Sequence, residues 1–460
     1  MARERNERLA ALLQEAGWSR AQAASAFSRI AQENNLLEYA HIGRSHVSMW
    51  VAGAKPSGAA PVILSQALSR RLKRIITPEE LGFTVPHAPE QEALDWHTDP
   101  TTTLTDLGRT DVDADRRSLL SGAVYSVAAL TLPDQGWWET MARQPPAPAD
   151  SQRVGRGDVA AVQELTAAFS RIDQRRGGGH GRKALARYLQ SDVAAFLQGT
   201  FPSEQVRRDM FSAAAELAYL SGWMGFDNGE HALAQRYFVL AVKLAARAGN
   251  PPLTGHILRA MAHQAIDLGF FAQGLELATA SMQGQRYASA TPRERALLGV
   301  VHARALAANG DKQAAAKALL TAEDDLSSAG EGIEEPQRTF FFGEASLAHE
   351  TACTLRDCGD HQGAIRQFRR SVRTRGDAFR RTHVVTLGYQ GSTQIASGGL
   401  EEACASWSTA LDVLEEGISS GRARQAVLDM RTRLSPYRRR RIPAVTQLDA
   451  RAAAYLARVH

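Results

Sequence analysis

The chain has 460 residues, which is too long for one small domain and indicates several. Hydrophobic residues make up 44% of the sequence and aromatic residues only 7%, a composition typical of an all-helical protein. Lys and Arg total 54 against 49 Asp and Glu, and this mild excess does not by itself indicate a nucleic-acid-binding protein.

The N-terminal part of the chain predicts four or five short helices within a compact domain. A first amphipathic helix covers 3–16, and Ser19 is placed to cap a second one. A Leu-rich helix follows from Pro61. Residues 77–83 carry the cap, the first-turn proline and the early acids that predict one more short helix.

Between these elements, residues 43–50 (GRSHVSMW) predict a short helix with one polar face. Val47 and Trp50 are three residues apart, so they share the inner face. Gly53 is placed to end the helix, and Pro56 prevents its resumption. The polar side chains of the outer face suit base edges and phosphates, which predicts the recognition helix of a helix-turn-helix domain.

The order W-S-x-x-x-x-A, then S-x-V-S-x-W, then G-x-x-P and a Leu-rich helix resembles the XRE (Cro/repressor-like) family over residues 3–83. The resemblance implies that double-stranded DNA is a partner. Between Ala24 and Gly43 the chain is longer than this family's usual connection, so 32–40 lengthens the second helix or forms an extra element. By position, the resemblance assigns phosphate contacts to Arg20 and Gln22, major-groove contacts to Arg44, Ser45, His46 and Ser48, and a backbone contact to Lys55.

The next segments connect this head to the rest of the chain. Residues 84–115 lack sustained periodicity and predict a linker, and 116–155 predict a connecting helix and loop. Arg116-Arg117 and the apolar run behind them look like a twin-arginine leader, but the run is short for a membrane span, which favours a buried helix. The basic run 70–74 fits either DNA phosphates or a solvated helix face.

From residue 156 onward the chain is helical by pattern, and one frame recurs five times within this part. In each copy a glycine is followed five residues later by a small residue, then by further apolar or small residues at helical spacing. The copies begin at Gly229, Gly269, Gly310, Gly359 and Gly398. The frame predicts helical hairpins and resembles the tetratricopeptide (TPR) pattern, which implies a TPR-like α-solenoid over 156–460 with a capping helix at 444–459. A generic helical bundle is the alternative.

The resemblance to TPR arrays implies a concave face lined by the first helix of each pair. Arginine, histidine, aspartate and aromatic side chains on that face suit an extended peptide, but each also fits an inter-repeat salt bridge or a packed core. The residues assigned to the face are Tyr219, Trp223, Asp227, Arg259, His263, Asp267, Arg304, His349 and Arg356.

The combination of head and repeats resembles the helix-turn-helix–TPR regulators of actinomycetes, and RRSLLSGAVYSVAAL and MAHQAIDLG are among the strings that carry the match. It implies a cytoplasmic, homodimeric transcriptional regulator whose repeats sense a peptide, a small ligand or a protein partner. Peptide-sensing quorum regulators match less well, because their groove asparagines are absent here. The alternative is a TPR protein-interaction scaffold whose head does not bind DNA.

Other function classes find little support in the sequence. Cys353, Cys358 and Cys404 are odd in number and lack metal-ligand spacing, which predicts free thiols in a reducing cytoplasm. The N-terminus has no signal-peptide apolar core, and no membrane association is expected. The glycine run at 177–181 is not followed by GK[ST], and no HExxH or nucleophile motif occurs. The sequence therefore predicts no catalytic residue, no cofactor and no metal.

Overall fold

The computed structural model describes residues 4–34, 36–83, 93–112, 125–143, 152–330, 332–440 and 442–458. These residues are predominantly helical, and the β-type pairing among them is an isolated bridge between Arg153 and Thr200. The all-α class predicted from the sequence is confirmed. The chain divides into two compact units, residues 1–162, 183–250 and 260–277 and residues 163–182, 251–259 and 278–460, which are described separately.

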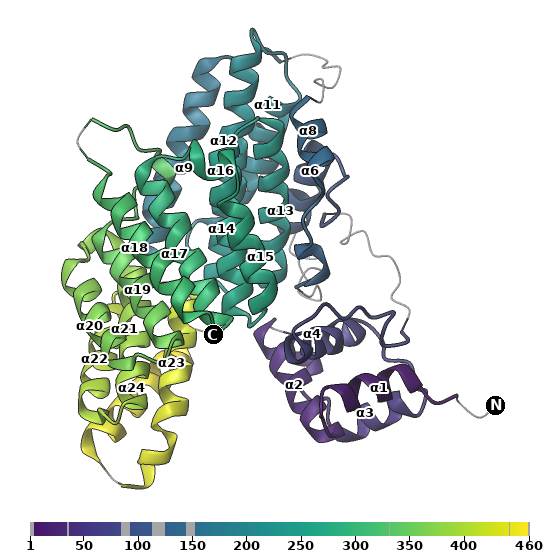
Figure 1. Cartoon of the computed structure of the whole chain (residues 1–460), viewed down its shortest axis with the longest axis vertical. Coiled ribbons are helices and arrows are strands. Elements are labelled where there is room, and N and C mark those ends of the chain that lie inside the picture. The colour runs from purple at the N-terminus through teal and green to yellow at the C-terminus, as the bar shows by residue number, and fades with distance from the viewer. Residues whose placement is uncertain are drawn as a thin grey trace. The chain divides into compact units, whose positions relative to one another are not determined.

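The first unit begins with the head, whose helices gather into one bundle (Figure 1). They are α1 (Glu7–Glu15), α2 (Arg20–Glu33), the 3-10 turn η1 (Leu37–Tyr39), α3 (Arg44–Val51) and α4 (Ala60–Leu72). Phe27, Val47, Leu64 and Leu81 come from different parts of the head and are fully buried in one core. The helix pattern of the sequence thus produces a single packed domain.

Residues 77–83 form hydrogen-bonded turns and not the short helix that the sequence predicts. The predicted cap is present, because Thr77 and Glu80 each accept the other's backbone N–H through their side chains. Gly82 then takes a φ of +77°, and the N–H of Phe83 bonds to the Pro78 carbonyl at 2.9 Å. This left-handed residue ends the segment after one turn.

A helix, α6 (Pro100–Val112), lies within the range predicted as linker. It packs on α13 (His231–Arg247), where the Tyr237 hydroxyl donates to Asp111 at 3.0 Å. Arg247 binds Asp99 at 2.8 Å just before α6. The described part of the linker is therefore fixed to a repeat helix by long-range polar contacts. Two further elements follow it, η2 (Ala128–Leu130) and α8 (Gln135–Arg143), and the twin-arginine motif lies outside the described residues.

The repeats are helical hairpins, as predicted. The helices that precede them are α9 (Arg156–Arg176), α10 (Arg182–Tyr188), the π-helical turn η3 (Leu189–Val193) and α11 (Ala194–Leu197). The hairpins are α12 (Glu204–Asp227) with α13, α14 (Pro251–Asp267) with α15 (Phe271–Ser281), α17 (Pro292–Ala308) with α18 (Lys312–Ser327), α19 (Glu344–Asp357) with α20 (His361–Thr374), and α21 (Arg380–Ala396) with α22 (Leu400–Leu414). The short helix α16 (Gln285–Ala288) and the 3-10 turns η4 (Gln337–Thr339) and η5 (Asp377–Phe379) lie between them.

The turn glycine of every hairpin has a positive φ, from +79° at Gly269 to +90° at Gly310. This conformation is strained for residues with a Cβ, which explains the glycine at the start of each frame. The small and apolar frame residues pack inside the hairpins, where Ala234, Phe238 and Ala364 are fully buried. The recurrent pattern therefore marks the turn and the helix crossing of each repeat.

The C-terminal part of the second unit closes on a separate apolar cluster. It contains α23 (Gly421–Leu434), the 3-10 turn η6 (Ser435–Arg440) and α24 (Pro443–Arg458), and α24 coincides with the predicted capping helix. Trp407 of α22 is almost fully buried there, together with Met430 of α23 and Tyr455 of α24. Among the described helices, none is both long enough and apolar enough to cross a membrane.

Candidate functional site

Helix α3 is held in the head by its inner face. Val47 is fully buried, and the Trp50 ring packs against Phe27 of α2 with 5.6 Å between the ring centroids. The helix begins at Arg44, and Nδ1 of His46 accepts the N–H of the preceding Gly43 at 3.2 Å. His46 therefore stabilises the first turn of the helix in the manner of a capping-box side chain.

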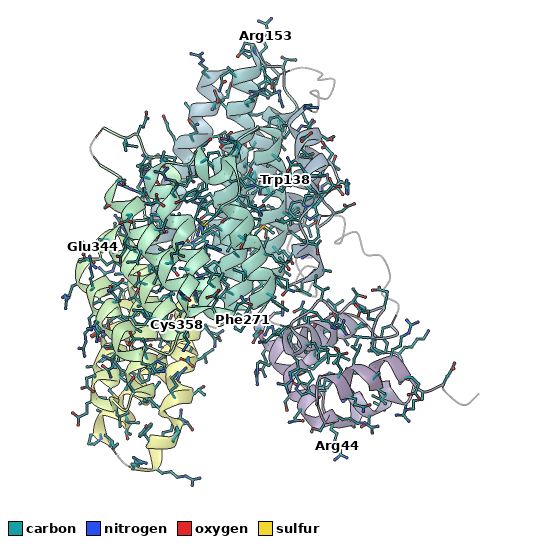
Figure 2. The ribbon with its side chains drawn as sticks, in the orientation of Figure 1. Arg44, Trp138, Arg153, Phe271, Glu344 and Cys358 are labelled. Atoms are coloured by element: carbon teal, nitrogen blue, oxygen red, sulfur yellow. The ribbon has the colours of Figure 1, made fainter. Side chains whose placement is uncertain are left out.

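The outer face of α3 presents the predicted DNA-contacting residues. Arg44 and Ser45 are exposed, His46 and Ser48 are half-buried, and the Arg44 side chain points away from the ribbon (Figure 2). The Ser48 hydroxyl donates to the Arg44 carbonyl at 2.9 Å, so it is anchored to the helix backbone. Met49 is also exposed, and it gives this polar face one apolar side chain.

Helix α2 carries two more of the predicted residues, and one of them lies next to α3. Nη1 of Arg20 lies 3.4 Å from the Ser48 hydroxyl, so the first residue of α2 is next to α3. Gln22 is exposed, but its Oε1 accepts the Ser19 N–H at 2.9 Å, which makes it a helix cap as well as a candidate phosphate ligand. Lys55 is exposed in the loop after α3. The structure therefore brings Arg20, Ser48 and Arg44 together on one surface.

The longer connection between α2 and α3 is a packed element. Helix α2 extends to Glu33, and Leu36 of the connection is fully buried. The Tyr39 hydroxyl accepts the Ala59 N–H at 3.0 Å, which ties η1 to the start of α4. The Ser28 hydroxyl lies 3.3 and 3.2 Å from the carbonyl oxygens of Ala40 and Ile42. The extra residues thus lengthen α2 and also form η1. They position Gly43 as the residue before α3.

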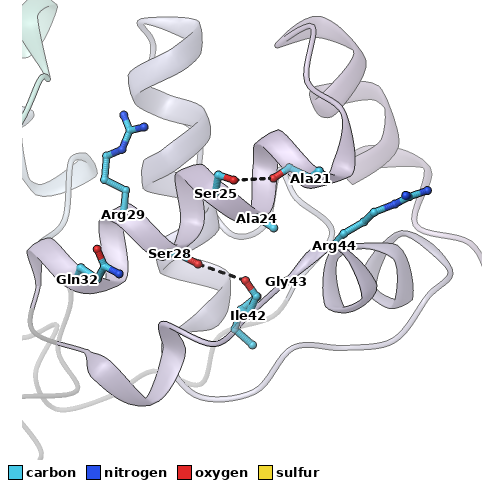
Figure 3. A pocket seen from close by; sticks show the side chains of 9 residues that line it. All are labelled: Ala21, Ala24, Ser25, Ser28, Arg29, Gln32, Ile42, Gly43 and Arg44. Atoms are coloured by element: carbon cyan, nitrogen blue, oxygen red, sulfur yellow. Dashed lines mark hydrogen bonds between the residues drawn. The ribbon is translucent and has the colours of Figure 1, made fainter. Parts of the chain in front are cut away.

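This arrangement creates a pocket of about 560 Å³ beside α3. It is lined by Ala21, Ala24, Ser25, Ser28, Arg29, Gln32, Ile42, Gly43 and Arg44. The side chains of Arg29 and Arg44 lie on opposite sides of it (Figure 3). The sequence did not assign Arg29 to the site, because its place next to α3 depends on the path of the longer connection. The hydroxyls of Ser25 and Ser28 already donate to backbone carbonyls, so the two guanidinium groups are what makes this surface suited to phosphate groups.

The basic run behind α3 has partners within the head. Nε of Arg71 donates to the Ala16 carbonyl at 2.9 Å. Arg74 binds Glu15 and Glu80, and its hydrogen bonds to these carboxylates raise its pKa. Arg70 binds Glu33 at 2.6 Å, and burial lowers the pKa of Arg70 although Glu33 opposes this effect. These three arginines therefore connect elements of the domain.

Among the repeat residues of the first unit that are predicted to bind a ligand, Tyr219, Trp223, His263 and Asp267 form one cluster. The Trp223 ring packs on Tyr219 and, edge to face, on His263, with centroids 6.5 and 5.9 Å apart. His263 Nε2 lies 3.6 Å from Asp267, and Asp227 is fully buried. The structure thus unites these residues, but largely in packed positions. Ligand contact by any of them stays a prediction.

The corresponding residues of the second unit also contact neighbouring helices. Arg304 lies 3.7 Å from Glu350, and His349 Nδ1 lies 2.9 Å from the Thr386 hydroxyl. Arg356 lies over the Tyr389 ring at 5.4 Å. Their contact with a ligand also stays a prediction.

Arg259 belongs to a buried polar group that links α14, α17 and η4. His256 lies 3.1 Å from both Arg259 and Glu294, and Arg338 binds Glu294 at 2.6 Å. Burial, assisted by Arg259, lowers the pKa of His256 to about 4 despite Glu294. Burial alone would raise the pKa of Glu294, but Arg338 and His256 outweigh it and lower this pKa to about 2. His256 is therefore neutral and Glu294 ionised at pH 7.

Metal-ligating side chains and the cysteine thiols are scattered over the described residues. Within the described ranges, no group of three or more histidine, cysteine or acidic residues is arranged to hold a metal ion. Cys353 is buried, and this burial raises the pKa of its thiol to about 12. That thiol is therefore protonated and poorly reactive at neutral pH.

Comparison with known proteins identifies similarity in the head. The model of the family described as the SP15 N-terminal domain matches residues 9–84. One solved structure is also similar to the chain: a signal transduction ATPase with numerous domains (STAND) from Pyrococcus horikoshii, which has a tetratricopeptide repeat sensor. Its sequence is 10% identical to this chain, and the TM-score of the two structures is 0.40. The alignment covers 88% of this chain and 72% of that one. No curated protein sequence matches the chain. The resemblance of the head to the XRE family thus remains an expectation.

Proposed function

We propose that the protein is a sequence-specific DNA-binding transcriptional regulator. The observation that carries this proposal is the outer face of α3, where Arg44, Ser45, His46 and Ser48 are accessible to different degrees and Arg20 lies alongside. A short helix with such a face suits the major groove, where arginine recognises guanine and serine and histidine accept or donate hydrogen bonds. Arg20, Gln22 and Lys55 are proposed to hold phosphates beside it.

The repeats are proposed to make this DNA binding conditional. TPR-like hairpins expose helix faces that suit peptides, small ligands or protein partners, and paired chains would bring two heads to one DNA site. Ligand binding in the repeats would then alter the spacing of the two heads. Since half-sites must lie on one face of the double helix, such a change would alter affinity.

The test is DNA capture from genomic fragments with the whole chain, followed by binding measurements on the enriched fragments. Arg44→Ala is expected to weaken binding by about 1–3 kcal/mol and to relax preference at one base pair. His46→Gln keeps an acceptor for the Gly43 N–H, so it separates base contact from helix capping. The control is Arg171→Ala, which removes the same charge from an exposed position on α9. Unchanged preference and unchanged salt dependence in Arg44→Ala would contradict the proposal.

A protein-interaction scaffold is the second candidate. Met49 is 48% exposed on the outer face of α3, and exposed methionines are common on surfaces that bind proteins. A scaffold predicts that the whole chain recovers one stoichiometric protein partner and enriches no DNA sequence. Under that outcome Met49→Lys would abolish partner binding, whereas Arg44→Ala would leave it intact.

A further inference from the structure

Residues 125–126 lie in the range predicted as a connecting helix and loop, and they contact both the head and the repeat helices. Tyr125 is fully buried, and its ring stacks on Phe270 with centroids 5.6 Å apart and planes at 22°. The backbone N–H and carbonyl of Ser126 both bond to the Gln235 amide of α13, at 2.8 and 2.6 Å. Gln235 is itself fully buried. The segment is therefore fixed to the first two hairpins.

The same segment is bonded to the head. The Tyr125 N–H donates to Oδ1 of Asn34 at 3.3 Å, and Asn34 is the C-terminal cap of α2. Arg70 of α4 places its guanidinium 4.9 Å from the centroid of the Phe270 ring and pairs with Glu33, the last residue of α2. Phe270 thus contacts a cation of the head and the ring of Tyr125. All these residues belong to the first unit.

We propose that these contacts form a latch that holds the head on the first two hairpins. The latch consists of Asn34 and Arg70 from the head, Tyr125 and Ser126 from the segment after α6, and Gln235 and Phe270 from the repeats. It goes beyond the proposed function, because it concerns how the head is held and not what the head binds.

The physical basis of the latch is aromatic burial supported by one partly buried cation. Two stacked aromatic rings exclude water from a large apolar area, and a guanidinium over one of them adds a cation–π attraction. Glu33 offsets the desolvation of Arg70, whose side chain is only 18% exposed. If the latch opens, Arg70 and Glu33 are rehydrated while Tyr125 loses its stack. Opening the latch therefore exposes the stacked rings to water, which favours the closed arrangement.

The position of the latch gives it a consequence for the head. Glu33 and Asn34 end α2, and the chain from there leads through the packed connection to α3. On the repeat side, Phe270 directly follows the turn of the α14–α15 hairpin and Gln235 lies in α13. A ligand or partner that shifts these two hairpins would break the latch contacts. Helix α3 would then no longer be held in a fixed orientation relative to the repeats.

The test is hydrogen exchange by mass spectrometry on the whole chain without DNA. Tyr125→Ala should speed exchange at the end of α2 and at residues 264–272 by about tenfold or more, while α19 to α22 stay unchanged. Tyr125→Phe is the matched control. The Tyr125 hydroxyl is buried with no hydrogen-bond partner among the described residues, so phenylalanine keeps the stack and removes an unpaired polar atom. This variant should exchange no faster than wild type.

A second control separates the side chain from the backbone of the segment. Ser126 bonds to Gln235 through its backbone, so Ser126→Ala should keep the latch and Gln235→Ala should open it. If Tyr125→Ala exchanges hydrogen at the wild-type rate at the end of α2 and at residues 264–272, the proposed latch is wrong. Equal acceleration in Tyr125→Phe and Tyr125→Ala would overturn the role of the stack. Because the exchange experiment contains no DNA, its outcome does not depend on whether the protein binds DNA.

Discussion

At the residue scale, Arg29 is the clearest addition that the structure makes to the candidate DNA surface. It lines the pocket beside α3 opposite Arg44 and is exposed. As a phosphate contact, Arg29→Ala should weaken binding about equally for all sequences and lower the slope of log K against log salt by roughly 1. Fluorescence titrations at several salt concentrations measure this slope. An unchanged slope would remove Arg29 from the surface, and Arg171→Ala again serves as the charge-matched control.

His256 makes stability depend on pH in a defined direction. In the folded protein its pKa is about 4, whereas the unfolded chain protonates near 6.5, so this contribution is complete above about pH 6.5 and is lost as the pH falls toward 4. Between pH 7 and pH 5 the loss from this group is about 2 kcal/mol. Denaturant unfolding of wild type and His256→Gln at both pH values measures the difference. If both proteins lose the same stability, His256 is not the titrating group.

The residues of the candidate site were predictable where the signal is local. Gly43, Val47, Trp50 and Gly53 mark the bounds and the inner face of α3 because helix ends and buried stripes are local features. Arg29 could not be assigned, because its position beside Arg44 depends on how Leu36 and Ser28 fix the longer connection. Its place in the site is a tertiary feature.

At the element scale, the hairpins depend on helix crossings that exclude larger side chains. A Cβ on Gly391 of α21 would lie 2.4 Å from Nε1 of Trp407, which is almost fully buried in α22. Gly391→Ala should therefore destabilise the protein by about 1–2 kcal/mol, although alanine in a helix interior would by itself stabilise by about 1 kcal/mol. Gly376→Ala is the control, because a Cβ at that position would meet no other atom within 4 Å. Chemical unfolding with Gly391→Ala at least as stable as wild type would contradict this packing.

The contrast between the hairpins and α6 shows which elements a sequence specifies locally. Each hairpin turn requires a positive φ, so Gly229 and its four counterparts recur at a fixed place. Helix α6 has a narrow apolar stripe, with Leu104 and Leu107 buried, and part of its support comes from Tyr237, far away in sequence. The recurring turn glycines can be recognised along the sequence, whereas the contact of α6 with Tyr237 cannot.

At the scale of the whole molecule, the composition and the repeats predicted the all-α fold, because both are properties of the entire chain. Residues within and just after the range predicted as linker are in contact with the repeats. Asp99, Asp111 and Tyr125 all bond to or pack against residues of the repeats. These contacts connect residues more than a hundred positions apart, and neither periodicity nor motif spacing reports them.

The proposed homodimer makes a prediction that concerns two whole chains on one DNA molecule. Two identical heads related by twofold symmetry read two half-sites, which must lie on the same face of the double helix, about 10 base pairs or a multiple apart. Inserting roughly 5 base pairs between the half-sites of a captured operator rotates them to opposite faces and should sharply weaken binding, and roughly 10 should restore much of it. Titration with mass photometry measures both the affinity and the number of chains bound. A single bound chain whose affinity ignores the spacing would show that one head reads DNA alone, and the proposed control by head spacing would then be wrong.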